Sequence, residues 1–235
     1  MKQVELNCIK TIKNELLNNN GINNHNCNYE YIKKLINNAR PNSKQNEFPD
    51  FYSGDSLIEH FTVTSSKDNK KGSDYSNYKN EFNKETNKYF QQEDLKEEAP
   101  QTITTNSFKG IYEDSSYENF NYSLKKHFDS HIYSLTSRQL ENNLVVFIVE
   151  QDDARLCIYE NNKFVRFYLL GEDKKMLLYL KQQYPNVNYL IFKQADVIEL
   201  INLNKIDELI IKAKDNLDIR GGRMNVVNCE TIIDM

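Results

Sequence analysis

Residues 144–149 have the sequence LVVFIV, and this short apolar run decides the fold. Six apolar residues are too few to span a membrane, and the β-branched Val and Ile favour an extended chain. A strand without a polar side must be covered on both faces. The run therefore predicts the centre of a sheet with helices on either side.

Apolar spacing around this run predicts the other elements. Hairpins are predicted between Phe48 and Ser65 and around Asn161-Asn162, and a second buried strand is predicted at 187–192. The predicted helices cover residues 3–18, 29–39, 117–140, 173–183, 196–203 and 205–213. The longest of them has the stripe Tyr117, Phe120, Leu124, His127, His131 and Leu135. The pattern favours one mixed α/β domain over residues 1–235.

Residues 66–107 break this pattern with a long polar stretch whose few aromatic anchors cannot offset roughly 1–2 kcal/mol of backbone entropy per ordered residue. We predict a mobile insertion here.

The chain carries 30 Lys and Arg against 34 Asp and Glu, so its net charge is −4. This balance argues against a surface that is positive all over and binds nucleic acid or membranes non-specifically.

The chain contains no apolar run of membrane-spanning length, and its first residues, MKQVELNCIK, lack the apolar core of a signal peptide. A cytoplasmic protein without a membrane partner is expected. The four cysteines, Cys8, Cys27, Cys157 and Cys229, form no CxxC pair, so neither a zinc site nor a disulfide framework is predicted.

Residues 48–63, FPDFYSGDSLIEHFTV, are the best candidate for chemistry. If Gly54-Asp55 form a type II′ turn, Asp50 stands directly opposite Glu59, with Cβ atoms roughly 5 Å apart on one sheet face. Two carboxylates so placed repel each other, and one pKa should rise unless a cation lies between them. A hard divalent ion such as Mg²⁺ or Mn²⁺ fits this position, and it can activate water for phosphodiester hydrolysis.

Pro49-Asp50 on one strand, followed by Glu59-His60-Phe61 on its partner, resembles the PD-(D/E)XK nuclease superfamily. The core of that superfamily runs αβββαβ, and 144–149 would be the strand after its second helix. The resemblance implies a restriction-endonuclease-like core over roughly residues 1–150 with a C-terminal α/β extension. It also implies that Asp50 and Glu59 hold the metal.

The sequence departs from the superfamily at position 61, where Phe61 replaces the motif lysine. Lys67 could reach the site only if the chain bends back after Thr64. Lys125 or Lys126 on the long helix could replace it, and the sequence does not choose among them. The loss is equally consistent with an inactive relative.

Other polar groups have simpler interpretations. His60 should point away from Glu59, because neighbouring strand residues face opposite sides. His127 and His131 are interpreted as helix-face histidines, since the glutamate of an HExxH zinc motif is absent. Glu150, Asp152 and Asp153 are interpreted as a solvated loop, and Arg220-Gly221-Gly222-Arg223 as a turn that could contact phosphate.

Two functions follow. The first is a metal-dependent nuclease that acts on DNA, in keeping with a restriction or defence endonuclease, with Asp50 and Glu59 as catalytic metal ligands. The second is a non-catalytic interaction or immunity-type protein that retains a nuclease-like fold and binds a protein partner. Whether the chain forms a homodimer stays open.

Overall fold

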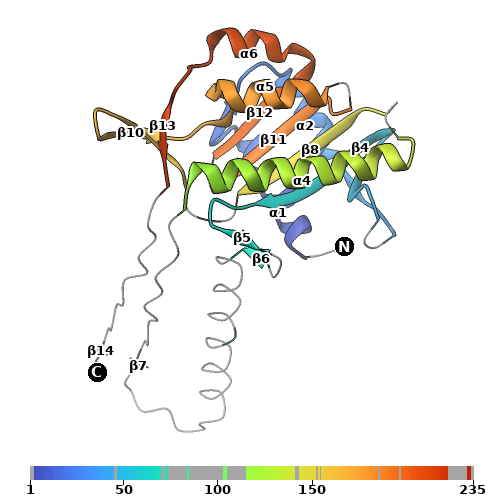
Figure 1. Cartoon of the computed structure of the whole chain (residues 1–235). Helices are drawn as coiled ribbons and strands as arrows, with labels where there is room; N and C mark the ends of the chain where they lie inside the picture. Colours follow the sequence, from blue (N-terminus) through green and yellow to red (C-terminus); the bar gives the residue numbers. More distant parts are fainter. Residues whose placement is uncertain are drawn as a thin grey trace.

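A computed structural model of the chain describes the main α/β body, shown in Figure 1. The described residues are 3–44, 47–69, 72–73, 84, 103–104, 115–140, 143–151, 153, 155–184, 186–195, 197–221 and 232–233. The mobile insertion predicted at 66–107 falls largely outside these residues. No helix within the described ranges is both long enough and apolar enough to cross a membrane.

A seven-stranded mixed sheet forms the centre of the molecule, in the order β1-β12-β11-β8-β4-β3-β2. β4, β8 and β11 are parallel neighbours, β3 and β2 continue antiparallel from β4, and β12 is antiparallel to β11. The sheet strands are β1 (Ile22–Asn24), β2 (Arg40–Pro41), β3 (Phe51–Ser53), β4 (Ser56–Val63), β8 (Val145–Gln151), β11 (Tyr189–Gln194) and β12 (Val197–Asn202).

Helices cover both faces of this sheet. Apolar side chains of α4, α5 and α6 pack on one face, and those of α1 and α2 on the other. Figure 1 shows α4 lying across the strands with α5 and α6 beside it. The helices are α1 (Gln3–Asn18), α2 (Tyr29–Asn37), α4 (Tyr117–Ser137), α5 (Lys174–Gln183) and α6 (Ile206–Lys212), with short 3₁₀ turns η1 (Leu170–Glu172) and η2 (Leu203–Lys205).

β8 confirms the prediction from the LVVFIV run. All seven of its residues are buried, and it is the fourth strand of seven. Val146 and Ile148 face α1 and α2, while Val145, Phe147 and Val149 face α4 and α5. The absence of a polar side therefore did mark the sheet centre.

Small sheets complete the described structure. β9 (Cys157–Glu160), β10 (Lys163–Phe167) and β13 (Asp218–Arg220) form a three-stranded sheet beside the main one. Asn161 and Asn162 both have positive φ, 50° and 62°, as the predicted hairpin turn requires. Two short pairs join β5 (Asp68–Asn69) to β6 (Gly72–Ser73) and β7 (Ile103–Thr104) to β14 (Ile232–Ile233).

The helix predicted at 196–203 was wrong, because Val197–Asn202 is strand β12. Gln194 pairs with Val197 across a tight turn in which Ala195 has φ of 50°. The short apolar run fits a helix or a strand equally well by spacing, and pairing with β11 and β1 decides for the strand. The C-terminal α/β part therefore belongs to the central sheet, to which it adds β11 and β12 beside β8.

Candidate functional site

The β3–β4 hairpin brings Asp50 and Glu59 together. Its register pairs Phe51 with Ile58 and Ser53 with Ser56, so that Asp50, one residue before β3, comes opposite Glu59. Gly54 has φ of 59°, as a glycine at the first turn position of a type II′ turn requires. The expected juxtaposition is therefore present in the folded chain.

Each of these two residues is held by the backbone of the other strand. The N–H of Asp50 donates to Glu59 Oε2 at 3.0 Å, and the N–H of His60 donates to Asp50 Oδ2 at 2.8 Å. Both carboxylates are thereby fixed on one side of the hairpin. Such reciprocal bonds reduce the conformational entropy that would be lost when the pair binds a ligand.

The carboxylates of Asp50 and Glu59 repel each other. Burial, followed by the charge of Glu59, raises the pKa of Asp50 from 3.8 to about 7, although the hydrogen bond from the His60 N–H opposes the rise. The negative charge of Glu5 on α1 raises this pKa further. A carboxyl with this property in a cleft is a candidate functional group, because a bound cation would relieve the repulsion.

A cavity of about 430 Å³ opens beside the pair. Its walls come from the start of α1, the β3–β4 hairpin and one flank of α4. The lining residues are Val4, Glu5, Glu47, Phe48, Asp50, Glu59, His60, Phe61, Thr62, His127 and His131. Four of these carry carboxylates, which gives the cavity the oxygen donors that a divalent cation prefers.

His131 belongs to this site, and the sequence interpretation missed it. Its Nδ1 lies 2.8 Å from Glu59 Oε1, and its side chain is 24% exposed. Its ring stacks on Phe61 with centroids 4.5 Å apart and planes 12° apart. The predicted apolar stripe contained His127 and His131, but Phe128 fills the core in their place. Their i, i+4 spacing at one edge of that stripe was the available signal.

Phe61 replaces the expected lysine with a core side chain. It is 5% exposed and meets Phe128 and Phe147 edge to face at 6.0 and 5.5 Å. No lysine lines the cavity among the residues that the structure describes. Lys125 lines a different pocket, Lys126 lies over the Tyr122 ring, and exposed Lys67 lies past the end of β4, outside the lining.

The opposite face of β4 carries a second histidine–glutamate pair. His60 Nε2 lies 3.2 Å from Glu150 Oε2, and Lys193 Nζ lies 2.6 Å from Glu150 Oε1. Cys8 of α1 comes close enough to form a possible Cys–His–Glu metal-ligand group with His60 and Glu150. The prediction that His60 points away from Glu59 agrees with this arrangement.

Glu150 is not part of a solvated loop, so that interpretation was wrong. Although burial acts to raise its pKa, the bonds from His60 and Lys193 prevail and hold the pKa at about 2. The Lys193 ammonium already neutralises this carboxylate, so the group is explained as a buried ionic network without a metal.

Two further sequence candidates have structural roles. Asp153 Oδ2 accepts bonds from the N–H groups of Ser65 and Ser66 at 2.6 and 3.0 Å, and so ties the end of β4 to β8. Arg220 binds Asp218 and Asn162, which occupies the guanidinium proposed for phosphate contact. Asp152, Gly222 and Arg223 lie outside the described residues.

Comparison with known proteins gives no match, so the function of this chain has to be inferred from the geometry of the site. No protein-family model matches the chain, and neither the curated proteins nor the solved structures contain a match.

Proposed function

We propose that this protein is a metal-dependent nuclease that hydrolyses DNA phosphodiester bonds, with Asp50 and Glu59 as ligands of Mg²⁺ or Mn²⁺. One observation carries the proposal. Two carboxylates that the β3–β4 hairpin brings together share a cavity of about 430 Å³, and burial and the charge of Glu59 raise the pKa of Asp50 to about 7. Carboxylate oxygens in such a cavity fit a hard divalent cation.

The order of elements supports the same class. α2 is followed by the antiparallel strands β2, β3 and β4, then by α4, and then by β8 parallel to β4. Apart from the short strands β5, β6 and β7 that precede α4, this order is compatible with the αβββαβ core of the PD-(D/E)XK superfamily, which Pro49-Asp50 and Glu59 resemble, and it supports the proposal. A restriction or defence endonuclease is part of the proposal.

The metal ligands and the residues that orient them have different roles in the proposed reaction. When bound, the ion supplies an activated water and stabilises the negative charge that develops on the phosphate. Asp50 becomes ionised, because a nearby cation favours the charged carboxylate. The Asp50 N–H and His131 orient Glu59 through its two oxygens, and the His60 N–H orients Asp50.

A second candidate is a non-catalytic interaction protein with a nuclease-like fold. Both oxygens of Glu59 already accept bonds, and no lysine lines the described cavity. These observations favour a site that has lost its chemistry and binds a protein partner elsewhere.

Cleavage of plasmid DNA with and without Mg²⁺ separates the two candidates. Asp50→Asn should abolish Mg²⁺-dependent cleavage if the proposal is right. Asp55→Asn is the matched control, because Asp55 is exposed in the turn of the same hairpin and outside the cavity. Absence of cleavage in the wild type supports the interaction protein, whereas equal Mg²⁺-dependent cleavage by both variants would contradict the role of Asp50 as a metal ligand.

A further inference from the structure

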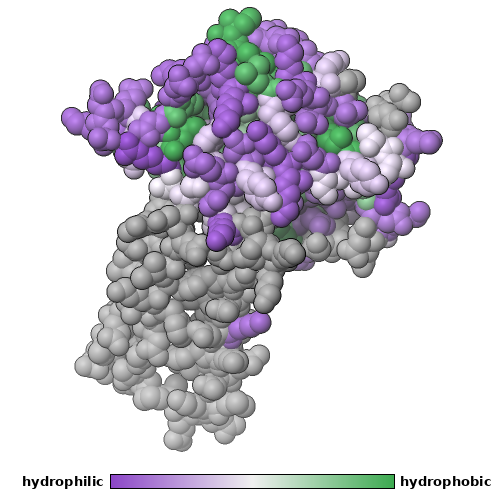
Figure 2. Space-filling view, in the orientation of Figure 1, coloured by the Kyte–Doolittle hydropathy of each residue, from purple (hydrophilic) through white to green (hydrophobic). Residues whose placement is uncertain are grey.

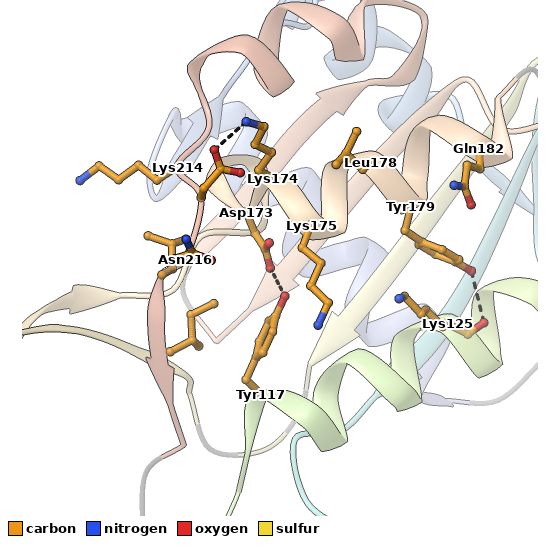
Figure 3. A pocket seen from close by; sticks show the side chains of 13 residues that line it. Tyr117, Lys125, Asp173, Lys174, Lys175, Leu178, Tyr179, Gln182, Lys214 and Asn216 are labelled. Carbon is orange, nitrogen blue, oxygen red and sulfur yellow. Dashed lines mark hydrogen bonds and ion pairs between the residues drawn. The ribbon is translucent and has the colours of Figure 1, made fainter.

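A second cavity, of about 550 Å³, lies between α4 and α5 (Figure 3). Tyr117 and Lys125 of α4 line it, whereas His127 and His131 of α4 line the Asp50 cavity. Lys125 and His127 are two residues apart and so point about 200° apart around the helix. The two cavities therefore lie on opposite flanks of α4 and can be tested separately.

This second cavity is positively charged in a protein whose net charge is −4. Its lining has four lysines, Lys125, Lys174, Lys175 and Lys214, and two aspartates, Asp173 and Asp215. Lys174 pairs with Asp215 at 2.7 Å, and Lys214 lies 3.8 Å from Glu160. Figure 2 shows that the face around α4 and α5 is mainly hydrophilic, with apolar atoms over α6 and in smaller patches to the left and right.

The carboxylate of Asp173, at the base of the cavity, already accepts three hydrogen bonds from the protein. Asp173 is 4% exposed, and its Oδ2 accepts bonds from the hydroxyls of Tyr117 and Tyr168 at 2.5 and 2.9 Å. Its Oδ1 caps α5 by accepting from the N–H of Met176 at 3.1 Å. This carboxylate is therefore a structural group, and it offers no direct partner to the lysines at the cavity mouth.

Of the four lysines that line this cavity, Lys125 and Lys175 have no carboxylate partner among the residues that the structure describes. Lys125 Nζ lies 5.1 Å from the centre of the Tyr179 ring, and Lys175 Nζ lies 5.6 Å from that of Tyr117. Figure 3 shows both ammonium groups pointing into the space between α4 and α5.

Hydrogen bonds hold both tyrosine rings in place. The Tyr117 hydroxyl donates to Asp173, and the Tyr179 hydroxyl donates to Asp129 Oδ1 at 2.6 Å. The rings in turn favour positions of the two lysines over their faces, since an ammonium is attracted to an aromatic face. The two cations are thus partly ordered before any ligand binds, which lowers the entropic cost of binding.

We propose that this cavity binds a phosphate group through Lys125 and Lys175. Two ammonium groups from different helices converge on one opening, and a phosphate offers several charged oxygens to receive them. The side-chain amides of Gln182 and Asn216 also line the cavity and provide further donors. The phosphate could belong to a nucleic-acid strand or to a small phosphorylated molecule, and the recognising chemistry is the same for both.

Calorimetric titration tests this proposal with four probes: inorganic phosphate, adenosine monophosphate, adenosine and a 12-base-pair DNA duplex. A phosphate-bearing probe should bind saturably to the wild type. The Lys125→Gln/Lys175→Gln variant should bind about 100-fold more weakly, because each charged hydrogen bond is worth roughly tenfold in affinity. The probe whose affinity falls more in this double variant, the nucleotide or the duplex, identifies the source of the phosphate.

Lys181→Gln is the matched control, because Lys181 lies on α5 outside the cavity and is half exposed. It should bind each probe like the wild type. The proposal is overturned if no phosphate-bearing probe binds, if adenosine binds as well as its monophosphate, or if the double variant keeps wild-type affinity with a native circular dichroism spectrum.

Discussion

The two faces of β4 carry the same pair of side chains with different consequences. On one face His131 meets Glu59 at 2.8 Å beside an open cavity, and on the other His60 meets Glu150 at 3.2 Å in the core. Glu150 also has Lys193 as a counter-ion, whereas Glu59 has Asp50 as a like-charged neighbour. Next to the first pair, Asp50 and Glu59 repel each other, and a bound cation would relieve this repulsion. In the second pair, the Lys193 ammonium already neutralises Glu150.

This difference separates a candidate site from a structural network. Buried carboxylates are tolerated when a cation inside the protein neutralises them. A carboxylate pair without such a cation raises a pKa and leaves the missing charge to a ligand. A histidine–glutamate pair alone therefore does not tell a binding site from a structural network. The third charged group decides, and this group is Asp50 beside the first pair and Lys193 beside the second.

Lys193→Met should have the largest effect on this comparison. It leaves Glu150 buried without its cation, which costs about 3–5 kcal/mol of unfolding free energy. Urea denaturation followed by circular dichroism measures the loss. Lys181→Met, which removes an exposed ion pair with Asp207, should change stability by less than about 1 kcal/mol. Equal stability of the two variants would contradict the structural role of the Glu150 network.

The pH dependence of stability should have opposite sign for the two carboxylates. The folded pKa of Asp50, about 7, lies above its ordinary 3.8, so its contribution to stability is full below pH 3.8 and is lost as pH rises to 7. Glu150, with a folded pKa of about 2 against 4.5, stabilises the protein above pH 4.5 and loses that contribution as pH falls towards 2.

Unfolding free energies of wild type and Asp50→Asn from pH 4 to pH 7 measure the first of these effects. The advantage of the variant should grow with pH by an amount on the order of 3 kcal/mol, since each pKa unit corresponds to about 1.36 kcal/mol. Parallel curves for the two proteins would show that Asp50 titrates normally in the folded state.

A divalent cation should stabilise the wild type through the Asp50 cavity. At a hundred times the dissociation constant, Mg²⁺ or Mn²⁺ should raise the unfolding free energy by about 2.7 kcal/mol. Asp50→Asn should lose this response, and Asp55→Asn should keep it. Thermal melts with and without the metal provide the measurement. A wild type that does not respond, together with an Asp50→Asn variant that melts higher, would favour the interaction protein.

His131→Leu should have the smallest effect. The Glu59 carboxylate loses one donor, but a side chain that is 24% exposed leaves room for water to replace it, so about 1 kcal/mol is expected. Tyr133→Leu is the control on the same helix, because Tyr133 is 74% exposed. Urea denaturation of both variants gives the difference, and a loss above about 3 kcal/mol would mean that His131 supports the core more than the cavity.

Local patterns in the sequence were sufficient for most of the fold. The four-residue spacing of Cys8, Ile12 and Leu16 predicted α1, and the apolar run at 144–149 predicted the central strand β8. The turn residues Gly54 and Asn161-Asn162 predicted both hairpins, because few residues adopt positive φ without strain. The position of the turn at Gly54-Asp55 was enough to predict that Asp50 lies opposite Glu59, because the turn fixes the register of the two strands.

Contacts between distant parts of the chain had to come from the tertiary structure. The sequence alone established the period of each segment and the pairing within each hairpin, because both depend on neighbouring residues. The tertiary structure decided that Val197–Asn202 is a strand, that His131 joins Glu59 and that Lys193 neutralises Glu150. These outcomes depend on strand order in the sheet and on which flank of α4 meets β4, and residues far apart in the chain carry no local pattern that records their contact.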